Sequence, residues 1–212
     1  MKKSSKLLFV ALLGLALTNC TNKSEEANDV NTEVCTFSYD NSSSNVGFTS
    51  YKFLSKAGVG GAFNDFNVSG GEANEDAAKV IESLSFEIPI SGLDTKDAGR
   101  DQNISTYFFG TINTNEITGK VVKLDAEKGE ATLSITMNGI SNDVVGKYTL
   151  IDTDFSFNAE INVNDWKAEQ GIEALNEECK ALHTDVANGD KVSKLWPDVS
   201  ISFTTTLKKE CP

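Results

Sequence analysis

The chain has 212 residues, with 31 acidic against 19 basic side chains and a formal net charge of −12. So acidic a chain repels phosphate backbones, which argues against a nucleic-acid partner. A single His, and four Cys without a CxxC pair, argue against a zinc centre, so we expect no metal site.

The first nineteen residues predict export. A lysine-rich start precedes an apolar run over 7–17, which is shorter than the roughly twenty residues of a membrane span but typical of a signal peptide. The run ends at Leu17-Thr18-Asn19-Cys20, which resembles a lipobox. We therefore predict a lipoprotein signal peptide over 1–19 and a lipid on Cys20. The alternative is an ordinary secretory signal that is cut elsewhere, with Cys20 incidental.

The rest of the chain divides into a short linker and one domain. Residues 20–33 are polar, acidic and without periodicity, so we expect a flexible tether. Residues 34–212 are long enough for one domain with a full core. We expect this domain to be held at a membrane by the lipid anchor, on the periplasmic face or the cell surface, and we leave a homodimer open.

Alternation of apolar and polar residues predicts β-strands through most of the domain. The alternation is clearest over 84–90, 131–137, 155–163 and 199–207, and weaker strands are expected near 36–40, 44–54, 59–69, 117–125 and 143–151. One apolar and one wet face per strand is typical of antiparallel sheets. The sequence therefore predicts an all-β fold, an antiparallel barrel of about eight strands.

Helices are expected in two places only. A stripe with spacing 4, 3, 4, 3 predicts one amphipathic helix of about four turns near the C-terminal end; its members are Ala168, Ile172, Leu175, Cys179 and Leu182. Asn164 or Asp165 is expected to cap its start. A shorter helical piece is expected over 100–108.

Three cysteines remain if Cys20 carries lipid, which allows one disulfide in an oxidising compartment. Cys35 opens the first strand and Cys211 closes the last one. Because these strands would be neighbours in a closed barrel, we favour the pair Cys35–Cys211. A bridge from Cys179 to either of them is the alternative.

The residues point to binding rather than catalysis. His183 is the only His, and no Gly-x-Ser-x-Gly or His-Glu-x-x-His motif occurs, so we predict no enzyme, no catalytic residues and no cofactor. A barrel enzyme with His183 as base stays as a rival. Twelve Phe can fill a small barrel or line a cavity for one elongated apolar ligand, and both readings stay open at this point.

Several short motifs, in order, resemble the YceI-like family. Val59-Gly60-Gly61-Ala62-Phe63-Asn64-Asp65-Phe66 resembles the family's V-x-G-x-F-x-x-F segment. The stretch from Gly99 to Phe109, GRDQNISTYFF, resembles its R-D-x-H-L-x-S-x-D-F-F signature. Ile117-Thr118-Gly119 and Asn138-Gly139-Ile140-Ser141 stand where the family has I-T-F and a G-V-T turn. The likeness runs over almost the whole domain.

This resemblance implies an extended, lipocalin-like barrel with a lengthwise apolar tunnel for isoprenoid chains such as quinones or polyprenyl lipids. The chain departs from the family at two signature positions, where Asn103 replaces His and Tyr107 replaces Asp.

We accordingly predict a lipoprotein that sequesters or transports a long isoprenoid-type or quinone-type lipid in a barrel tunnel. The side chains expected to line it are Phe48, Phe63, Phe86, Ile88, Phe108, Phe109, Leu133, Ile135, Phe157 and Phe203. A slip of one residue in strand register would turn these side chains outward. The alternative is a surface-anchored structural or protein-interaction module with a filled barrel and no ligand.

Overall fold

The computed structural model describes residues 34–212. The predicted signal peptide (1–19), the predicted lipid-bearing Cys20 and the tether (20–33) lie outside the described residues and stay predictions. No helix among the described residues is long and apolar enough to cross a membrane.

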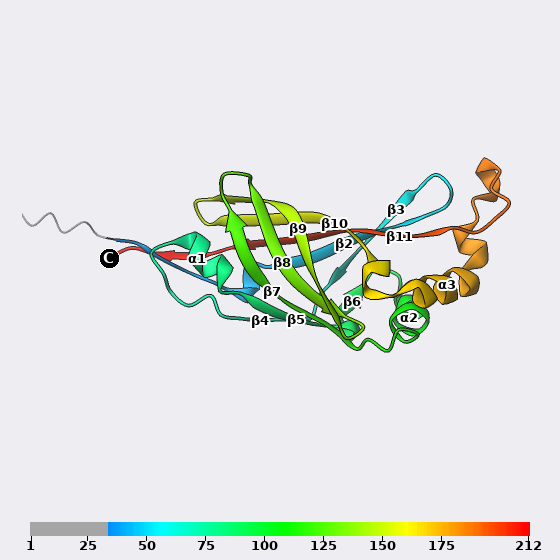
Figure 1. Cartoon of the computed structure of the whole chain (residues 1–212), viewed down its shortest axis with the longest axis horizontal. Helices are drawn as coiled ribbons and strands as arrows, with labels where there is room; N and C mark the ends of the chain where they lie inside the picture. Colours follow the sequence, from blue (N-terminus) through cyan, green and yellow to red (C-terminus); the bar gives the residue numbers. More distant parts are fainter. Residues whose placement is uncertain (1–33) are drawn as a thin grey trace, which may run out of the picture. The chain divides into compact units, whose positions relative to one another are not determined.

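Antiparallel strands dominate the described residues. Their bounds are β1 (Thr36–Ser38), β2 (Asn45–Lys52), β3 (Ala57–Phe63), β4 (Asn67–Ser69), β5 (Ser85–Pro89), β6 (Leu93–Asp94), β7 (Glu116–Asp125), β8 (Glu130–Met137), β9 (Ile140–Ile151), β10 (Asp154–Asn162), β11 (Leu195–Thr206) and β12 (Lys208–Glu210). Ten of them form one sheet in the order β4-β5-β7-β8-β9-β10-β11-β2-β3-β6. This sheet curls into a half-barrel (Figure 1), which confirms the all-β antiparallel fold class.

Two segments of the chain each contribute a strand to both edges of the curled sheet. β3 continues after a break at 64–66 into β4, which lies at the other edge, and β5 continues after a break at 90–92 into β6. The breaks pair with each other, because Asn64 N donates to Gly92 O at 2.8 Å. A Cβ on Gly92 would lie 2.8 Å from the backbone of Asp65, so only glycine permits this approach.

These breaks explain why the strand count exceeds the expected eight. The single strand predicted over 59–69 is wrong, since its two halves pair with different neighbours: β3 with β2 and β6, and β4 with β5. Periodicity alone does not reveal such a break, because the alternation continues through it.

The first and last strands form a separate two-stranded sheet. β1 pairs with β12, and a disulfide joins Cys35 to Cys211 just outside this pairing. The favoured bridge is therefore present, but the reason given for it is corrected: the two strands are neighbours in a small sheet of their own, not in the wall of a closed barrel. Cys179 is free and buried.

The core follows the predicted strand parity. Along β8 the side chains of Ala131, Leu133, Ile135 and Met137 are all buried, as the alternation requires. On the neighbouring β9, Val144 is buried and Val145 is exposed. The apolar faces of the strands therefore point into the curl of the sheet.

Helical segments cover one end and one side of the sheet. They are α1 (Ala77–Glu82), α2 (Ala98–Asn103), α3 (Glu169–Glu178), the π-helix η3 (Ile104–Phe109) and the short 3-10 turns η1 (Asn41–Ser43), η2 (Ile90–Gly92), η4 (Val163–Trp166), η5 (Lys180–His183) and η6 (Val186–Asn188). α2 and α3 lie together at one end of the sheet, while α1 lies toward the other (Figure 1). α1 was not predicted from the sequence.

The predicted amphipathic helix is present but shorter than expected. α3 ends at Glu178, and the chain continues as the turn η5. Ala168, Leu175 and Cys179 of the predicted stripe are buried, whereas Leu182 is exposed. The predicted cap is wrong: Ala168 holds the N-cap position without a side-chain hydrogen bond.

Candidate ligand-binding cavity

A wide cavity of about 420 Å³ lies where α2, η3 and α3 meet the curled sheet. Its volume falls in the range of small-molecule sites. The strands supply Phe48, Ser50, Lys52, Val59, Phe63, Leu93, Ile117, Met137, Ile161, Leu195, Trp196, Val199 and Ile201; the helical segments and their flanking residues supply Asp97, Gly99, Arg100, Asn103, Ile104, Phe108, Phe109, Val163, Ile172, Leu175, Cys179, Leu182 and His183.

A narrower cavity of about 130 Å³ lies deeper inside the sheet. Its lining is Val46, Gly47, Phe48, Phe63, Phe66, Val68, Leu84, Phe86, Ile88, Ile117, Val121, Leu133, Ile135, Met137, Phe155, Phe157, Ile161, Trp166, Ile201, Ser202 and Phe203. Ser202 is the one hydroxyl-bearing residue among them. A space of this size and polarity suits a hydrocarbon chain better than water, which needs polar partners.

The two cavities adjoin. Six residues line both of them: Phe48, Phe63, Ile117, Met137, Ile161 and Ile201. The rings of Phe48 and Phe63 stand at this junction with their centroids 5.6 Å apart. A flexible chain that passes beside this ring pair would reach from the wide cavity into the narrow one.

Two Phe side chains on the inner face of the sheet pack against glycines on the neighbouring strands. Phe48 pairs with Gly61 across β2 and β3, and Phe86 pairs with Gly119 across β5 and β7. A Cβ on Gly61 would lie 2.4 Å from the Phe48 ring, and one on Gly119 would lie 2.3 Å from the Phe86 ring. Each ring therefore lies against a glycine backbone instead of projecting into the lumen.

The π-helix places two adjacent aromatic residues in the wide cavity. Phe108 and Phe109 are both buried, with ring centroids 4.8 Å apart in an edge-to-face arrangement. Gly171 of α3 packs on Phe108, where a Cβ would lie 2.9 Å from the ring. This close approach of α3 to η3 forms the roof of the cavity.

All ten side chains that the sequence predicted as ligand-binding line one of the two spaces. Phe108 and Phe109 line the wide cavity and Phe48 and Phe63 line both; the narrow cavity takes Phe86, Ile88, Leu133, Ile135, Phe157 and Phe203. For the eight of them that lie on strands this position is as the alternation predicted, while ligand binding by all ten stays a prediction.

Sequence reasoning missed several lining residues. Ile161 and Ile201 share the strand parity of Phe157 and Phe203, so the same alternation could have found them. Trp166 could not be found in this way, because it belongs to the turn η4. It is almost fully buried, and its Nε1 donates to Ile135 O at 3.0 Å.

The Arg100–Asp101 pair of the signature holds the loop at the rim of the wide cavity. Arg100 donates from Nε to Thr95 Oγ1 at 2.9 Å and from Nη2 to Thr95 O at 2.8 Å. Asp101 Oδ1 accepts from Thr95 N at 2.8 Å and from the Thr95 hydroxyl. A guanidinium carries five N–H donors, and these bonds use two of them, so three N–H groups of Arg100 stay available on a residue that lines the wide cavity.

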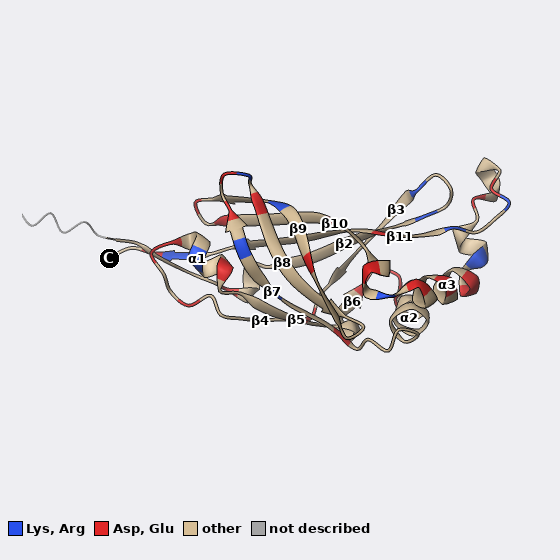
Figure 2. Cartoon of the chain, in the orientation of Figure 1, with Lys and Arg blue, Asp and Glu red and all other residues tan. Residues whose placement is uncertain are grey.

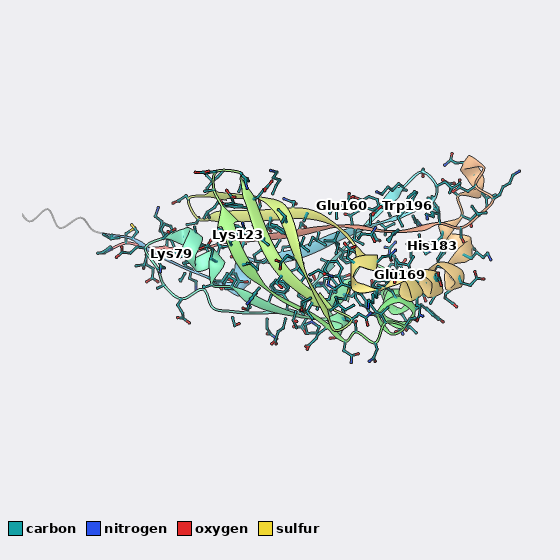
Figure 3. All side chains as sticks on the ribbon, in the orientation of Figure 1. Lys79, Lys123, Glu160, Glu169, His183 and Trp196 are labelled. Carbon is teal, nitrogen blue, oxygen red and sulfur yellow. A yellow bond between two sulfur atoms is a disulfide. The ribbon has the colours of Figure 1, made fainter. Side chains whose placement is uncertain are left out.

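His183 and Cys179 lie on the same side of the wide cavity, and both are buried. Burial, together with the nearby charge of Lys52, lowers the pKa of His183 to about 4, so its imidazole is neutral at pH 7. Its Nδ1 lies 3.1 Å from Asn176 Oδ1. Figure 3 shows His183 and Trp196 at the end of the sheet covered by α3.

Asn103, which replaces the signature His, contacts the buried thiol. Its Nδ2 donates to Cys179 Sγ at 3.4 Å. Burial raises the pKa of the Cys179 thiol, which keeps it protonated and unreactive. Within residues 34–212, no three His, Cys, Asp or Glu side chains gather as a metal site would require.

Comparisons with known proteins agree with this fold. Residues 37–207 match the model of the YceI-like domain. A polyisoprenoid binding domain from Saccharophagus degradans, implicated in plant cell wall breakdown, aligns with a TM-score of 0.53 and 16% identity over 85% of this chain and 99% of that one. BcnA of Burkholderia cenocepacia aligns with a TM-score of 0.51 and 16% identity over 79% and 96%. No curated protein sequence matches this chain significantly.

Proposed function

Because the chain belongs to the YceI-like domain family, we propose that it binds a long apolar lipid of the isoprenoid or quinone type inside its curled sheet. The observation that carries the proposal is the pair of adjoining apolar cavities. A solid interior would have favoured the structural or interaction module instead. The relative from Saccharophagus degradans is described as polyisoprenoid binding, which supports an isoprenoid chain as ligand.

The two cavities suggest how the ligand is oriented. The narrow cavity offers almost no polar partner, so it takes the end of the hydrocarbon tail. The wide cavity carries Arg100, Asn103 and His183 on its lining and therefore takes the polar head. A head group with hydrogen-bond acceptors, such as a quinone carbonyl, suits the free donors of Arg100.

Burial of the tail supplies the affinity. Each methylene removed from water contributes about 0.8 kcal/mol, which corresponds to about a fourfold change in Kd. A dozen buried carbons contribute about 10 kcal/mol, and micromolar binding corresponds to about 8 kcal/mol, so any cost of ordering the chain beyond this difference must be met by further carbons or by the head group. Affinity should therefore rise along the series geraniol, farnesol and geranylgeraniol until the narrow cavity is full.

A blocked cavity tests this function. Leu133→Trp places an indole in the narrow cavity, and Val145→Trp adds the same side chain on the exposed face of the next strand. We expect Leu133→Trp to bind farnesol and geranylgeraniol equally weakly by calorimetry, while Val145→Trp behaves as the unchanged protein. Equal binding by all three proteins would refute a tail in the narrow cavity.

We propose further that the protein is a lipoprotein anchored through Cys20, and that it sequesters or transports its ligand at the periplasmic face or the cell surface. The lipobox-like residues before Cys20 support the anchor. Replacement of Cys20 by Ser should move the protein from the membrane fraction to the soluble fraction. Retention in the membrane fraction would contradict the anchor.

The proposal assigns no catalytic role to His183. The imidazole is buried, neutral at pH 7 and hydrogen-bonded to Asn176, which suits a structural role. We expect His183→Ala to keep a tail-length dependence like that of the unchanged protein. A lipid substrate that the unchanged protein converts and His183→Ala does not would favour the rival enzyme.

A further inference from the structure

Two loops are joined side by side at the end of the sheet farthest from the disulfide-bonded termini (Figure 1). One is the β2–β3 turn, residues 52–57, and the other is the segment 180–196 that contains η5 and η6; together we call them the tip. Phe53 N donates to Lys194 O at 2.9 Å, and Leu54 N donates to Asp190 Oδ2 at 3.2 Å. Lys52 Nζ donates to Leu182 O at 3.0 Å. The tip is therefore a single hydrogen-bonded unit.

Exposed apolar side chains gather on the tip. Leu54, Leu182, Val186 and Val192 are 53%, 62%, 75% and 59% exposed. They are four of the eight large exposed hydrophobic residues found among residues 34–212. Single exposed hydrophobic residues are ordinary, but a concentration of them in two short loops indicates a surface that contacts something apolar.

The tip is also basic in an acidic protein. It contains five lysines (Lys52, Lys56, Lys180, Lys191 and Lys194) and two acids, so its net charge is +3 against −12 for the whole chain. Both acids are engaged in the loop itself: Asp190 Oδ2 accepts from Leu54 N, and Asp185 Oδ1 accepts from Asn188 N.

Two of these lysines have acidic partners nearby. Lys56 pairs with Asp198 at 3.0 Å, and Lys180 pairs with Glu177 at 3.3 Å. Figure 2 shows acidic positions along α3 and lysines beyond it on the tip. The positive charge is therefore confined to the outer loops. Because the acids of α3 lie next to these loops, only a surface in direct contact with the tip would meet a positive potential.

The wide cavity reaches the surface at the tip. Lys52, Leu182 and Trp196 line this cavity and belong to the tip. Since Leu182 is both a lining residue and 62% exposed, the mouth of the cavity opens beside the apolar patch. A molecule seated on the patch would also face the mouth.

We propose that the tip docks on an anionic lipid bilayer, inserting Leu54, Val186 and Val192 at the boundary between headgroups and acyl chains. Apolar side chains flanked by lysines are the composition that binds such an interface. Docking places the cavity mouth against the membrane, so that a lipid passes between bilayer and cavity without crossing water. This surface goes beyond the proposed ligand binding, and its test is separate.

Flotation with vesicles tests the proposal. The protein is residues 21–212, which contain both sheets, the core and the disulfide of the folded unit, and which begin after Cys20 and so carry no lipid anchor. The vesicles contain phosphatidylethanolamine with or without one-third phosphatidylglycerol. The tip variant carries Leu54→Ser, Val186→Ser and Val192→Ser, none of which lines a cavity. The control carries Val122→Ser, Val145→Ser and Ile151→Ser, which are exposed and lie away from the tip.

We expect the unchanged protein and the control to float with anionic vesicles, and the tip variant to bind at least tenfold more weakly. Lys191→Gln with Lys194→Gln should abolish the preference for anionic vesicles. Flotation of the tip variant equal to that of the control would overturn the proposal. So would failure of the unchanged protein to float with either vesicle, an outcome that assigns the patch to a protein partner instead.

Titration with farnesol in vesicle-free solution separates this proposal from the proposed function. The tip variant should bind farnesol as the unchanged protein does, because its cavity is intact. Transfer of bound lipid into vesicles should accelerate with vesicle concentration for the unchanged protein but not for the tip variant. Equal acceleration for both proteins would overturn the role of the tip in exchange.

Discussion

A single added methyl group should close the junction between the two cavities. In Gly61→Ala the new Cβ would lie 2.4 Å from Cζ and 2.7 Å from Cε1 of Phe48, and 2.9 Å from Cγ2 of Thr95, against ordinary carbon contacts of about 3.5–4.0 Å. The ring must therefore move by about 1 Å or more toward the lumen, where it stands at the junction of the two cavities. The tail of a bound lipid would then stop at the junction.

The loss of affinity depends on how many methylenes of the lipid tail are kept out of the narrow cavity. If the displaced ring keeps about four methylenes out of the narrow cavity, the loss is about 3 kcal/mol, more than a hundredfold in Kd. Geraniol, which is short enough for the wide cavity, should lose much less than geranylgeraniol. The variant should therefore flatten the dependence of affinity on tail length.

Intrinsic fluorescence can follow this binding, because the chain has two Trp and both line a cavity: Trp166 the narrow one and Trp196 the wide one. Gly60→Ala is the matched control, since its Cβ would meet only Phe48 O at 3.9 Å. Urea unfolding of both variants checks that the fold is kept. A role of the Phe48 ring at the junction is refuted if Gly61→Ala keeps the full tail-length dependence, or if Gly60→Ala loses as much of it.

Three further predictions concern stability and the buried thiol. Loss of the Cys35–Cys211 bridge, which spans 176 residues, should lower the free energy of unfolding by up to about 5 kcal/mol in urea titrations; an unchanged midpoint in Cys35→Ala/Cys211→Ala would contradict this. The folded-state pKa of His183, about 4, lies below its ordinary value near 6.5. As the pH falls, the unfolded chain therefore binds the proton first, and the free energy of unfolding decreases between about pH 6.5 and pH 4. We expect a loss of about 2 kcal/mol between pH 7 and pH 5 that is absent in His183→Gln; an equal loss in both proteins would assign it to other groups. Because Cys179 is buried and lines the cavity, iodoacetamide should modify it slowly in the native protein and more slowly with farnesol bound; a rate that ignores farnesol would argue against a ligand in the wide cavity.

The sequence predicted the wall of the cavity well, because a period of two fixes which side chains share a face. Leu133 and Ile135 on β8 and Phe157 on β10 face inward as this period requires. The same reasoning could not predict that the interior is hollow, since packed and hollow barrels use the same apolar residues. The glycines opposite Phe48 and Phe86 keep the rings against the wall, and that pairing depends on strand register.

Other features depended on contacts that the sequence alone does not specify. The break in the strand predicted over 59–69 follows from the close approach of Gly92 to Asp65, which are far apart in the chain. The predicted helix stopped at Glu178, and Leu182 became part of an exposed loop instead of the apolar stripe. The tip was missed because its two loops are separated by more than a hundred residues in the sequence.

The most direct test of lipid binding is native mass spectrometry of residues 21–212, recovered without detergent from the cells that make the protein. We expect a stoichiometric apolar adduct that organic extraction removes, and whose mass identifies the chain length and head group. An unliganded mass, together with no uptake of added quinone or polyprenol, would argue against lipid binding and favour a structural or interaction module.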